Sequence, residues 1–288
     1  MKKLIIGDSH IKESAIPELE IIFQEILQQD AKEFIHLGDY YDNKRPTAKE
    51  IIFGTKWMLK FKKKYKKVIL IRGNHEKTGN TSIVDYFTYM GIKVLDEYID
   101  KNNCYYSHFM TNKSLYEYGS FQKTVKELRQ YNYTLLGHQH NPQALEPNMY
   151  HLGSVRYCQF NEVTDPYKRI AVIEKGKLEF IKLNSPIPMI DVKSISEVTK
   201  QKDRNCKIRL VISSFDQFKE EVNEIAKWKD KFVEFKVKLD FSNIVSRKQP
   251  LPKTVKRKRL QEILQEGIAK IEDTDVKNLL QEQLEEIK

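Results

Sequence analysis

The amino-acid sequence predicts an α/β fold in which β-sheets are stacked and helices cover their outer faces. In the first 183 residues, short apolar runs of strand length alternate with segments of helical periodicity. Beyond residue 136 the pattern changes to closely spaced hairpins, which are typical of added antiparallel strands. With 40% hydrophobic and 11% aromatic residues, the chain can bury a substantial core, so disorder throughout is excluded.

The first part of the chain consists of successive strand–helix units. Residues 17–30 are expected to form a helix, because Leu19, Ile22, Phe23 and Ile26 recur at helical spacing on one face. A second helix is expected at 47–66. The strands expected around these helices are residues 2–7, 33–37, 68–71, 134–136, 170–173 and 178–183, the last two joined by a turn at 174–176.

A segment rich in proline, Asn184-Ser185-Pro186-Ile187-Pro188, predicts a domain boundary, so the first domain is expected at 1–186. A small α+β capping domain is expected at 187–244, with strands at 207–212 and 232–241. Ser214 and Gln217 have the spacing of a capping box and predict the start of the helix between these strands. Such a β-α-β unit is too small for an independent core, so we expect it to pack against the first domain or a partner.

The last segment, 245–288, begins with a basic stretch without acidic residues: Arg247, Lys248, Lys253, Lys256, Arg257, Lys258 and Arg259. Residues 260–271 and 276–287 then repeat an apolar spacing typical of amphipathic helices. Helices this short are marginally stable alone. Their apolar faces must therefore dock, either on the rest of this chain or on a partner.

Composition excludes several classes of protein. The longest aliphatic runs, such as Val68-Ile69-Leu70-Ile71, are far shorter than the roughly 20 residues that a membrane helix needs. Three scattered cysteines, Cys104, Cys158 and Cys206, argue against a disulfide framework and fit a reducing compartment. A net charge of +10 favours an anionic partner. We therefore expect a soluble cytoplasmic protein that does not bind membranes.

Five short polar segments follow or end predicted strands and contain five of the seven histidines. They are Asp8-Ser9-His10, Gly38-Asp39-Tyr40-Tyr41-Asp42, Gly73-Asn74-His75-Glu76, His108 and Gly137-His138-Gln139-His140. Each segment alone is also compatible with an ordinary turn or helix cap. Because ligands of open α/β sheets bind outside the carboxyl ends of strands, we expect the five segments to converge. Carboxylate, imidazole and amide ligands without thiolate suit Mn²⁺, Fe²⁺ or Zn²⁺.

In this order and spacing, the segments resemble the motifs of the calcineurin-like metallophosphoesterases over residues 4–183. The resemblance implies a four-layered α/β/β/α sandwich holding two divalent ions, with Mn²⁺ expected and Mg²⁺, Fe²⁺ or Zn²⁺ as alternatives. It assigns one ion to Asp8, His10, Asp39 and His140, and the other to Asp39, Asn74, His108 and His138, so that Asp39 bridges them. It also implies that His75 is the general acid, whereas Asp42 is expected to orient its surroundings.

Within that family the chain is most similar to the branch that contains SbcD, a DNA double-strand-break repair nuclease, and its phage counterparts. Residues 35–95, the Gly153-Ser154 element and the order of the three parts carry this similarity. It implies a homodimeric DNA exonuclease or endonuclease subunit that binds an SMC-like ATPase of the SbcC type through residues 260–288, in the host cytoplasm if the source is viral. DNA contacts are expected at Lys248, Lys253, Lys256, Arg257, Lys258, Arg259 and Arg156.

Other interpretations stay open at this point. Arg72 precedes Gly73-Asn74-His75-Glu76 as it does in phosphoprotein phosphatases, where that arginine holds substrate phosphate, but Asp42 is not followed by their Arg-Gly. A phosphoesterase for cyclic nucleotides, phosphomonoesters or phosphoproteins is an alternative, and so is a non-catalytic scaffold, although the intact ligand set argues against the scaffold. Tyr40 and Tyr41 are expected either to stack on a base or to pack internally. His36 is expected in the core, and His151 has no assigned role.

Overall fold

The computed structural model describes residues 1–79, 81–115 and 121–240. The chain divides into two compact units, Met1–Pro186 and Ile187–Lys288. The basic stretch at 247–259 and the two helices expected within 260–288 lie outside the described residues, and so do the DNA contacts expected there. Every helix among the described residues is too short or too polar to cross a membrane.

The first sheet of unit 1 has six strands in the order β13-β12-β1-β2-β3-β6. Strands β1, β2, β3 and β6 run parallel, whereas β12 pairs antiparallel with both β1 and β13. Their bounds are β1 Lys3–Ile6, β2 Glu33–His36, β3 Lys67–Ile71, β6 Lys93–Leu95, β12 Arg169–Glu174 and β13 Lys177–Lys182.

The second sheet has five strands in the order β10-β11-β9-β8-β7. Its central strands β8, β9 and β11 are parallel to one another. The bounds are β7 Glu97–Ile99, β8 Cys104–His108, β9 Tyr133–Gly137, β10 Gln143–Glu146 and β11 Met149–His151. A separate two-stranded ribbon consists of β4 Lys77–Thr78 and β5 Thr81–Ser82.

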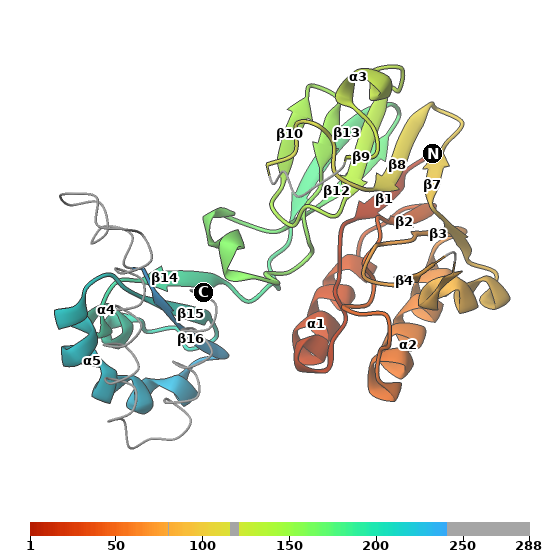
Figure 1. The fold of residues 1–288 in the computed structure, drawn as a ribbon. Coiled ribbons are helices and arrows are strands. Elements are labelled where there is room, and N and C mark those ends of the chain that lie inside the picture. Colours follow the sequence, from red (N-terminus) through yellow and green to blue (C-terminus); the bar gives the residue numbers. More distant parts are fainter. Residues whose placement is uncertain (80, 116–120, 241–288) are drawn as a thin grey trace. The chain divides into compact units, whose positions relative to one another are not determined.

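Two long helices, α1 (Ile16–Leu27) and α2 (Ala48–Lys64), lie on the same side of the first sheet (Figure 1). The start of α2 is set by a capping box, in which the Thr47 hydroxyl accepts from the Glu50 N–H and the Glu50 carboxylate accepts from the Thr47 N–H. Helix α3 (Val125–Leu128) packs on the second sheet. Shorter 3₁₀ helices are η1 Glu13–Ala15, η2 Ile83–Met90 and η3 Phe160–Thr164.

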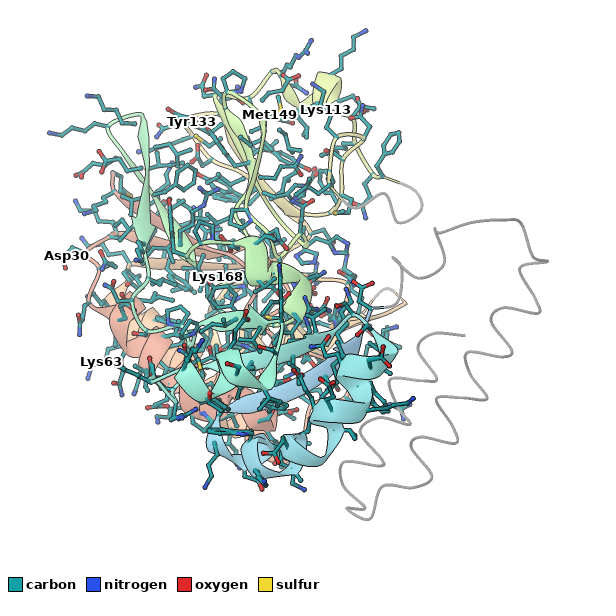
Figure 2. All side chains as sticks on the ribbon, turned by 90° about the vertical axis from the view of Figure 1, so that its left-hand side faces the viewer. Asp30, Lys63, Lys113, Tyr133, Met149 and Lys168 are labelled. Carbon is teal, nitrogen blue, oxygen red and sulfur yellow. The ribbon has the colours of Figure 1, made fainter. Side chains whose placement is uncertain are left out.

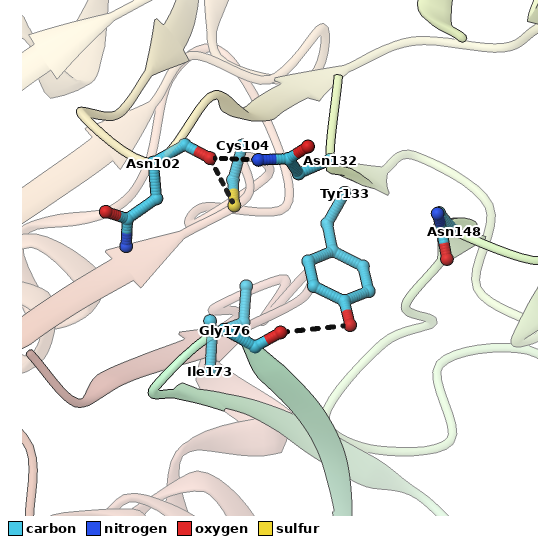
Figure 3. Close-up of a pocket in the computed structure, with 7 residues that line it drawn as sticks. All are labelled: Asn102, Cys104, Asn132, Tyr133, Asn148, Ile173 and Gly176. Carbon is cyan, nitrogen blue, oxygen red and sulfur yellow. Dashed lines mark hydrogen bonds between the residues drawn. The ribbon is translucent and has the colours of Figure 1, made fainter. Parts of the chain in front are cut away.

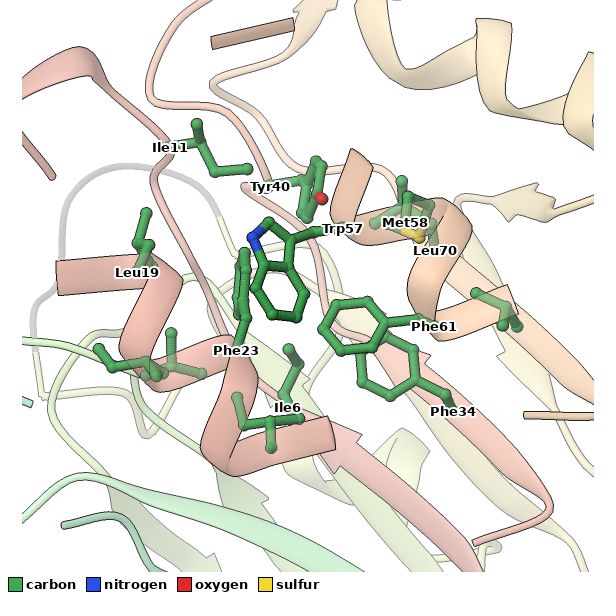
Figure 4. Packing of buried hydrophobic residues seen from close by; sticks show 14 of the residues in the cluster. Ile6, Ile11, Leu19, Phe23, Phe34, Tyr40, Trp57, Met58, Phe61 and Leu70 are labelled. Atoms are coloured by element: carbon green, nitrogen blue, oxygen red, sulfur yellow. The ribbon is translucent and has the colours of Figure 1, made fainter. Parts of the chain in front are cut away.

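The alternation of side chains along each strand divides the core into three layers. Leu4 and Ile6 of β1 pack with the helices, where aromatic rings from α1, α2 and β2 fill the layer (Figure 4), whereas Ile5 points between the sheets. In β8, Tyr106 joins the layer between the sheets and Tyr105 packs beneath α3. The order of layers is therefore α/β/β/α, which confirms the predicted fold class.

Unit 2 is a three-stranded parallel sheet in the order β14-β15-β16. Val198, Ile208, Leu210 and Ile225 belong to a buried cluster of its own, so the expectation that this segment lacks an independent core was wrong. The sequence interpretation missed a strand and a helix that complete this cluster. The elements are β14 Met189–Val192, α4 Ile195–Lys200, β15 Lys207–Ile212, α5 Phe215–Trp228, η4 Lys229–Lys231 and β16 Glu234–Leu239.

The start of α5 differs in one detail from the predicted capping box. The Ser214 hydroxyl accepts from the Gln217 N–H at 3.1 Å, as expected. The Gln217 side chain, however, accepts from the N–H of Ser213 at 3.0 Å instead of from that of Ser214. The side chain of Gln217 therefore binds the residue that precedes the N-cap, Ser213, and not the N-cap itself.

A buried carboxylate links the two sheets of unit 1. Lys3 of β1 donates a hydrogen bond to Asp100, which follows β7, and both side chains are almost fully buried. Asp100 also accepts from the Tyr106 hydroxyl at 3.0 Å and from the N–H groups of Asn102 and Cys104 at 2.7 and 3.1 Å. Burial opposes its charge, but the bonds from Lys3 and these N–H groups outweigh burial and lower the pKa of Asp100.

We predict that Asp100→Asn destabilises the protein by about 3–5 kcal/mol at pH 7, because the Lys3 ammonium loses its anion inside the core. Since the folded-state pKa of Asp100 is lowered, its contribution is present above its unfolded pKa of about 3.9 and is lost as the pH falls below that value. Urea melts between pH 7 and pH 3 measure both effects. Glu13→Gln, which removes the exposed pair with Lys49, should cost less than about 1 kcal/mol.

Candidate metal centre

The five polar segments meet where the two sheets present the carboxyl ends of their parallel strands. Asp8 and His10 follow β1, Asp39 follows β2 and Asn74 follows β3, all in the first sheet. His108 is the last residue of β8, and His138 follows β9 in the second sheet. Tertiary structure thus brings together residues that are far apart in the sequence, such as His10 and His140, which are separated by 130 positions.

One group of donor atoms comes from both sheets. The amide Oδ1 of Asn74 lies 2.6 Å from His138 Nδ1 and 2.9 Å from His108 Nε2. The two histidine nitrogens are 3.2 Å apart. His108 Nε2 is also 3.1 Å from Asp39 Oδ2. Four donor atoms therefore surround one point.

A second group adjoins the first through the same carboxylate oxygen. His10 Nε2 lies 2.8 Å from His140 Nε2 and 3.8 Å from Asp39 Oδ2. The buried Asp8 carboxylate lies 4.0 Å from His140 Nε2. Asp39 Oδ2 thus faces both groups, while Asp39 Oδ1 accepts from the His75 N–H at 3.0 Å.

The donor set fits divalent cations. Two imidazole nitrogens face each other at 2.8 Å, a contact that needs a proton or a cation between them. Ligating atoms lie within 4.8 Å of one another in three sets: His10, Asp39 and His75; Asp39, His108 and His138; and His10, His140 and Cys158. These nitrogen and oxygen ligands are those that Mn²⁺, Fe²⁺ and Zn²⁺ accept. The sequence interpretation did not associate Cys158 with this site.

The backbone of the site is strained. His10, Asp39 and His138 have φ angles of 46°, 48° and 80° and lie in the left-handed region that side chains disfavour. Each such residue costs of order 1–3 kcal/mol and persists only where its surroundings enforce it. These backbone conformations direct three ligand side chains from separate loops into the same site.

Glycine permits the close approach of these loops at two positions. A Cβ on Gly73 would lie 1.9 Å from Asp39 Oδ1, and one on Gly137 would lie 2.3 Å from the carbonyl oxygen of Leu37 and 2.7 Å from Asp8 Oδ1. Any side chain at either position would push the donor segments apart. The glycines of the Gly-Asn-His and Gly-His-x-His motifs are therefore required by packing.

Buried charges polarise the site. Burial opposes the Asp39 charge, but His108 and His10 outweigh it and hold the pKa of Asp39 well below its usual range. Burial also opposes protonation of His108, yet the carboxylates of Asp39 and Asp8 raise its pKa to about 9. Burial lowers the pKa of His138 to about 4. A cation held by these residues would supply the positive charge that a proton on His108 supplies without it.

His75 lies at the exposed edge of the two donor groups. Its Nδ1 donates to the carbonyl oxygen of Asp42 at 2.8 Å, so Nε2 is the ring nitrogen that this hydrogen bond does not occupy. Its ring meets the edge of His10 with centroids 4.8 Å apart. The Asp42 carboxylate in turn lies 3.1 Å from His10 Nδ1. This geometry fits the orienting role expected of Asp42, which stays a prediction.

A buried network behind His140 was missed by the sequence interpretation. Glu162 Oε1 lies 3.1 Å from His140 Nδ1, and Glu162 Oε2 accepts from Lys168 Nζ at 2.6 Å and from the Ser154 hydroxyl at 2.9 Å. Glu162 and Lys168, the latter labelled in Figure 2, have fully buried side chains. Burial alone raises the pKa of Glu162, but His140 and Lys168 outweigh it and hold the value at about 2. In the sequence, only Gly153-Ser154 hinted at this network.

We predict that Glu162→Gln weakens metal binding about 10- to 100-fold, because a carboxylate on the outer nitrogen of a ligating histidine orients the ring and raises its basicity. Isothermal titration of the metal-free protein with Mn²⁺ measures the loss. Glu174→Gln, which neutralises an exposed glutamate at the end of β12, is the matched control. Unchanged Mn²⁺ affinity in a folded Glu162→Gln protein would contradict this role.

Glu76 and Arg72 connect the third motif to its neighbours. The buried Glu76 carboxylate accepts from the N–H groups of Tyr41 and Gly73 at 2.8 and 3.1 Å, so it joins the second and third motifs. Burial, and then the nearby Asp39, raise the pKa of Glu76 to about 8. The Arg72 guanidinium is held by Asp85 at 2.7 Å and Asp96 at 3.1 Å. These ion pairs give no support to the phosphate-holding alternative for Arg72.

The expectation that Arg156 contacts DNA was wrong. Its side chain is buried, with a relative exposure of 2%, and it donates to the carbonyl oxygens of Ser9 and His10 at 3.2 Å each. Glu18 lies 3.8 Å away as a buried counter-charge. Arg156 therefore supports the backbone that carries His10.

The remaining aromatic residues of the motifs are structural. Tyr40 and Tyr41 are fully buried, so they pack internally and base stacking is excluded. The Tyr41 hydroxyl lies 2.8 Å from that of Tyr86. His36 is buried against the Ser9 hydroxyl at 2.7 Å, as expected, and His151 is buried against Ser114 at 2.7 Å.

A cavity of about 280 Å³ lies away from these residues (Figure 3). Its walls include Cys104 and Tyr133, which begin β8 and β9, whereas His108 and His138 stand at the other ends of the same strands. Five residues of strand span roughly 15 Å. This amide-lined cavity is therefore distinct from the donor cluster.

Comparison with known proteins identifies the family. The sequence pattern described as calcineurin-like phosphoesterase matches residues 1–202. The chain belongs to the calcineurin-like phosphoesterase family. Members of this family bind divalent metals, and the histidine and aspartate groups described above could hold such ions. No curated protein matches the chain.

Several solved structures are similar to part of this chain. A Vps29 mutant from Entamoeba histolytica is 15% identical (TM-score 0.40), and its full length aligns with 64% of this chain. YfcE, a phosphoesterase from E. coli, is 19% identical (TM-score 0.37), with 94% of it aligned to 64% of this chain. The nuclease MPE from Pseudomonas putida is 17% identical (TM-score 0.31), with 87% aligned to 62%. Similarity this low carries no argument about substrate.

Proposed function

We propose that this calcineurin-like phosphoesterase is a binuclear metal-dependent phosphodiesterase that cleaves DNA, as the nuclease subunit of an SbcCD-like repair or recombination complex. The observation that carries the chemical part is the position of Asp39 Oδ2, which lies 3.1 Å from His108 Nε2 and 3.8 Å from His10 Nε2. One carboxylate oxygen facing two donor groups is the arrangement that a bridging ligand requires.

The proposed ligands form two sets that share Asp39. They are Asp8, His10, Asp39 and His140 for one ion, and Asp39, Asn74, His108 and His138 for the other. Bound there, two divalent ions would supply a nucleophile at neutral pH and would stabilise the charge that develops on a phosphate. We propose Mn²⁺, with Mg²⁺, Fe²⁺ or Zn²⁺ as alternatives.

The proposed general acid is His75. Its Nδ1 is engaged by the carbonyl oxygen of Asp42 at 2.8 Å, so the ring presents Nε2 from the exposed edge of the site. A proton delivered from Nε2 to the departing sugar oxygen keeps that oxygen from leaving as an alkoxide. The backbone N–H of His75 donates a hydrogen bond to Asp39 Oδ1, which holds the loop that carries His75 next to the proposed bridging carboxylate.

Charge and the order of the segments in the sequence support DNA as the proposed substrate and an ATPase as the proposed partner. The net charge of +10 favours a polyanion, and residues 247–259 carry seven basic residues without an acidic one. Residues 260–288 instead carry eight acidic and three basic residues, with two apolar faces at helical spacing. We propose that residues 260–288 bind an SMC-like ATPase and that the nuclease acts as a homodimer.

A cleavage assay tests the function. The full-length protein with Mn²⁺ is incubated with labelled duplex DNA and, separately, with a p-nitrophenyl phosphomonoester, with and without a co-encoded ATPase. Cleavage of DNA that disappears with chelator and in the Asp39→Asn variant supports the proposal. Rapid hydrolysis of the monoester with no DNA cleavage would replace it by a phosphomonoesterase.

The proposed partner site makes a separate prediction. Deleting residues 247–288 should abolish association with the ATPase in a pull-down, because both apolar faces are removed. Mn²⁺ binding should be unchanged, since all proposed ligands lie before residue 141. ATPase association that survives the deletion would contradict this assignment.

A further inference from the structure

A second cavity in unit 1, of about 250 Å³, adjoins the loop that carries His140. Its walls include Pro142, Tyr150, Asp165, Tyr167 and Arg169. Pro142 follows His140 by two residues, so their Cα atoms are at most about 7 Å apart. We call this cavity the Arg169 site.

Arg169 is a cation without an anion. Across residues 1–79, 81–115 and 121–240, no carboxylate forms an ion pair with its guanidinium, and its buried Nε has no hydrogen-bond partner. The side chain is half-buried, and burial lowers the pKa of Arg169 despite the nearby Asp165. An arginine held this way has unused donors in a fork that matches a phosphate.

The Asp165 carboxylate in the wall shares a buried lysine with Glu162. The Asp165 carboxylate lies 2.9 Å from Lys168 Nζ, which is fully buried. Lys182 adds an exposed cation 5.8 Å above the ring of Tyr167. The cavity therefore offers net positive charge to a ligand.

Aromatic rings frame the same cavity. Tyr167 is 40% exposed, and Tyr150 is half-buried with its ring against Phe180, centroids 5.1 Å apart. The guanidinium carbon of Arg169 also lies 4.1 Å from the centroid of the Phe180 ring, and this cation–π contact holds the Arg169 side chain in place. Aromatic faces interleaved with cations are the surface that unpaired bases and their phosphates bind.

We propose that the Arg169 site binds one nucleotide of a DNA single strand next to the metal centre, with Arg169 on its phosphate and the Tyr167 ring against its base. This inference rests on the proposed nuclease function and specifies its substrate as a strand with unpaired bases. Pro142 in the wall follows the proposed ligand His140 by only two residues, so this wall lies at most about 7 Å from that residue, measured between Cα atoms. The site would therefore hold a nucleotide close to the scissile one.

Equilibrium binding of a fluorescent oligothymidylate to the full-length protein, with the metal ions bound and followed by anisotropy at several salt concentrations, tests the proposal. Arg169→Gln should weaken binding at least about 5-fold and lower the salt slope by about 0.7, the value for one lost phosphate contact on a single strand. Tyr167→Ala should weaken binding between about 5-fold and 100-fold with the slope unchanged.

Matched controls are Lys177→Gln, an exposed cation at the other end of β13, and Tyr89→Ala, whose ring is 93% exposed in η2. Both should bind the strand as the wild type does. Hydrolysis of bis(p-nitrophenyl) phosphate, a diester too small to reach both sites, should be unchanged in all four variants.

Arg169→Gln and Tyr167→Ala proteins that are folded and bind the strand with wild-type affinity and salt slope would overturn the Arg169 site. Failure of the nuclease proposal has a different signature. In that case the wild type fails to cut DNA in the cleavage assay, whatever the binding of the strand to these variants.

Discussion

Replacing Asp39 with asparagine should remove metal binding and turnover together. Asp39 Oδ2 faces both donor groups, and only a carboxylate supplies negative charge to two cations at once. The loss of Mn²⁺ affinity should exceed the roughly 10- to 100-fold that loss of an outer hydrogen-bond partner costs. Elemental analysis after loading and desalting measures the bound metal, and the cleavage assay measures the turnover.

The matched control is Asp30→Asn, which removes an exposed carboxylate after α1. It should bind metal and turn over as the wild type does. An Asp39→Asn protein that retains two ions per chain would refute the bridging role. Circular dichroism and thermal melting of each variant establish that it is folded.

Replacing His75 with alanine should leave both ions bound and reduce kcat on DNA about 10²- to 10⁴-fold, the contribution of a general acid. His75 contributes its backbone N–H to Asp39, and alanine keeps that bond. Its ring lies at the exposed edge of the site, so removing it leaves the buried donors in place. Metal content and kcat are measured on the same preparation.

Substrates with different leaving groups distinguish a general acid from a residue that is only structural. A p-nitrophenolate leaves without needing a proton, so His75→Ala should lose far less activity on bis(p-nitrophenyl) phosphate than on DNA. Tyr89→Ala, which removes an exposed ring in η2, is a suitable control. Equal losses on both substrates, or wild-type kcat on DNA, would count against His75 as the acid.

The sequence was sufficient to predict the layered architecture and the convergence of the motifs. Alternation along strands such as Leu4-Ile5-Ile6 is a local property, and each side chain goes to the layer that its position dictates. The motifs follow strands that run parallel, and parallel strands end at the same edge of a sheet. The convergence of the motifs could therefore be expected before any coordinates were known, whereas the grouping of Asp39 with His108 and His138 came from the family resemblance.

The residue type alone did not predict which polar and aromatic side chains near the site are buried. Arg156 and Arg169 both follow the Gly-Ser element in the sequence, and only the structure shows that Arg156 supports a buried loop while Arg169 lines a cavity. Tyr40 and Tyr41 directly follow Asp39 in sequence, yet both side chains are buried in the core. Whether a polar side chain faces solvent or a buried partner depends on the neighbours that distant segments provide.

Local patterns, which repeat every two residues in strands and about every 3.6 in helices, thus account for the elements, the layers and the edge at which the donors meet. Pairings between distant residues, such as Glu162 with His140 and Lys3 with Asp100, leave no periodic trace, because each depends on one contact between surfaces that folding brings together. They exist because a charge taken out of water must find a partner, and that partner is chosen by three-dimensional packing.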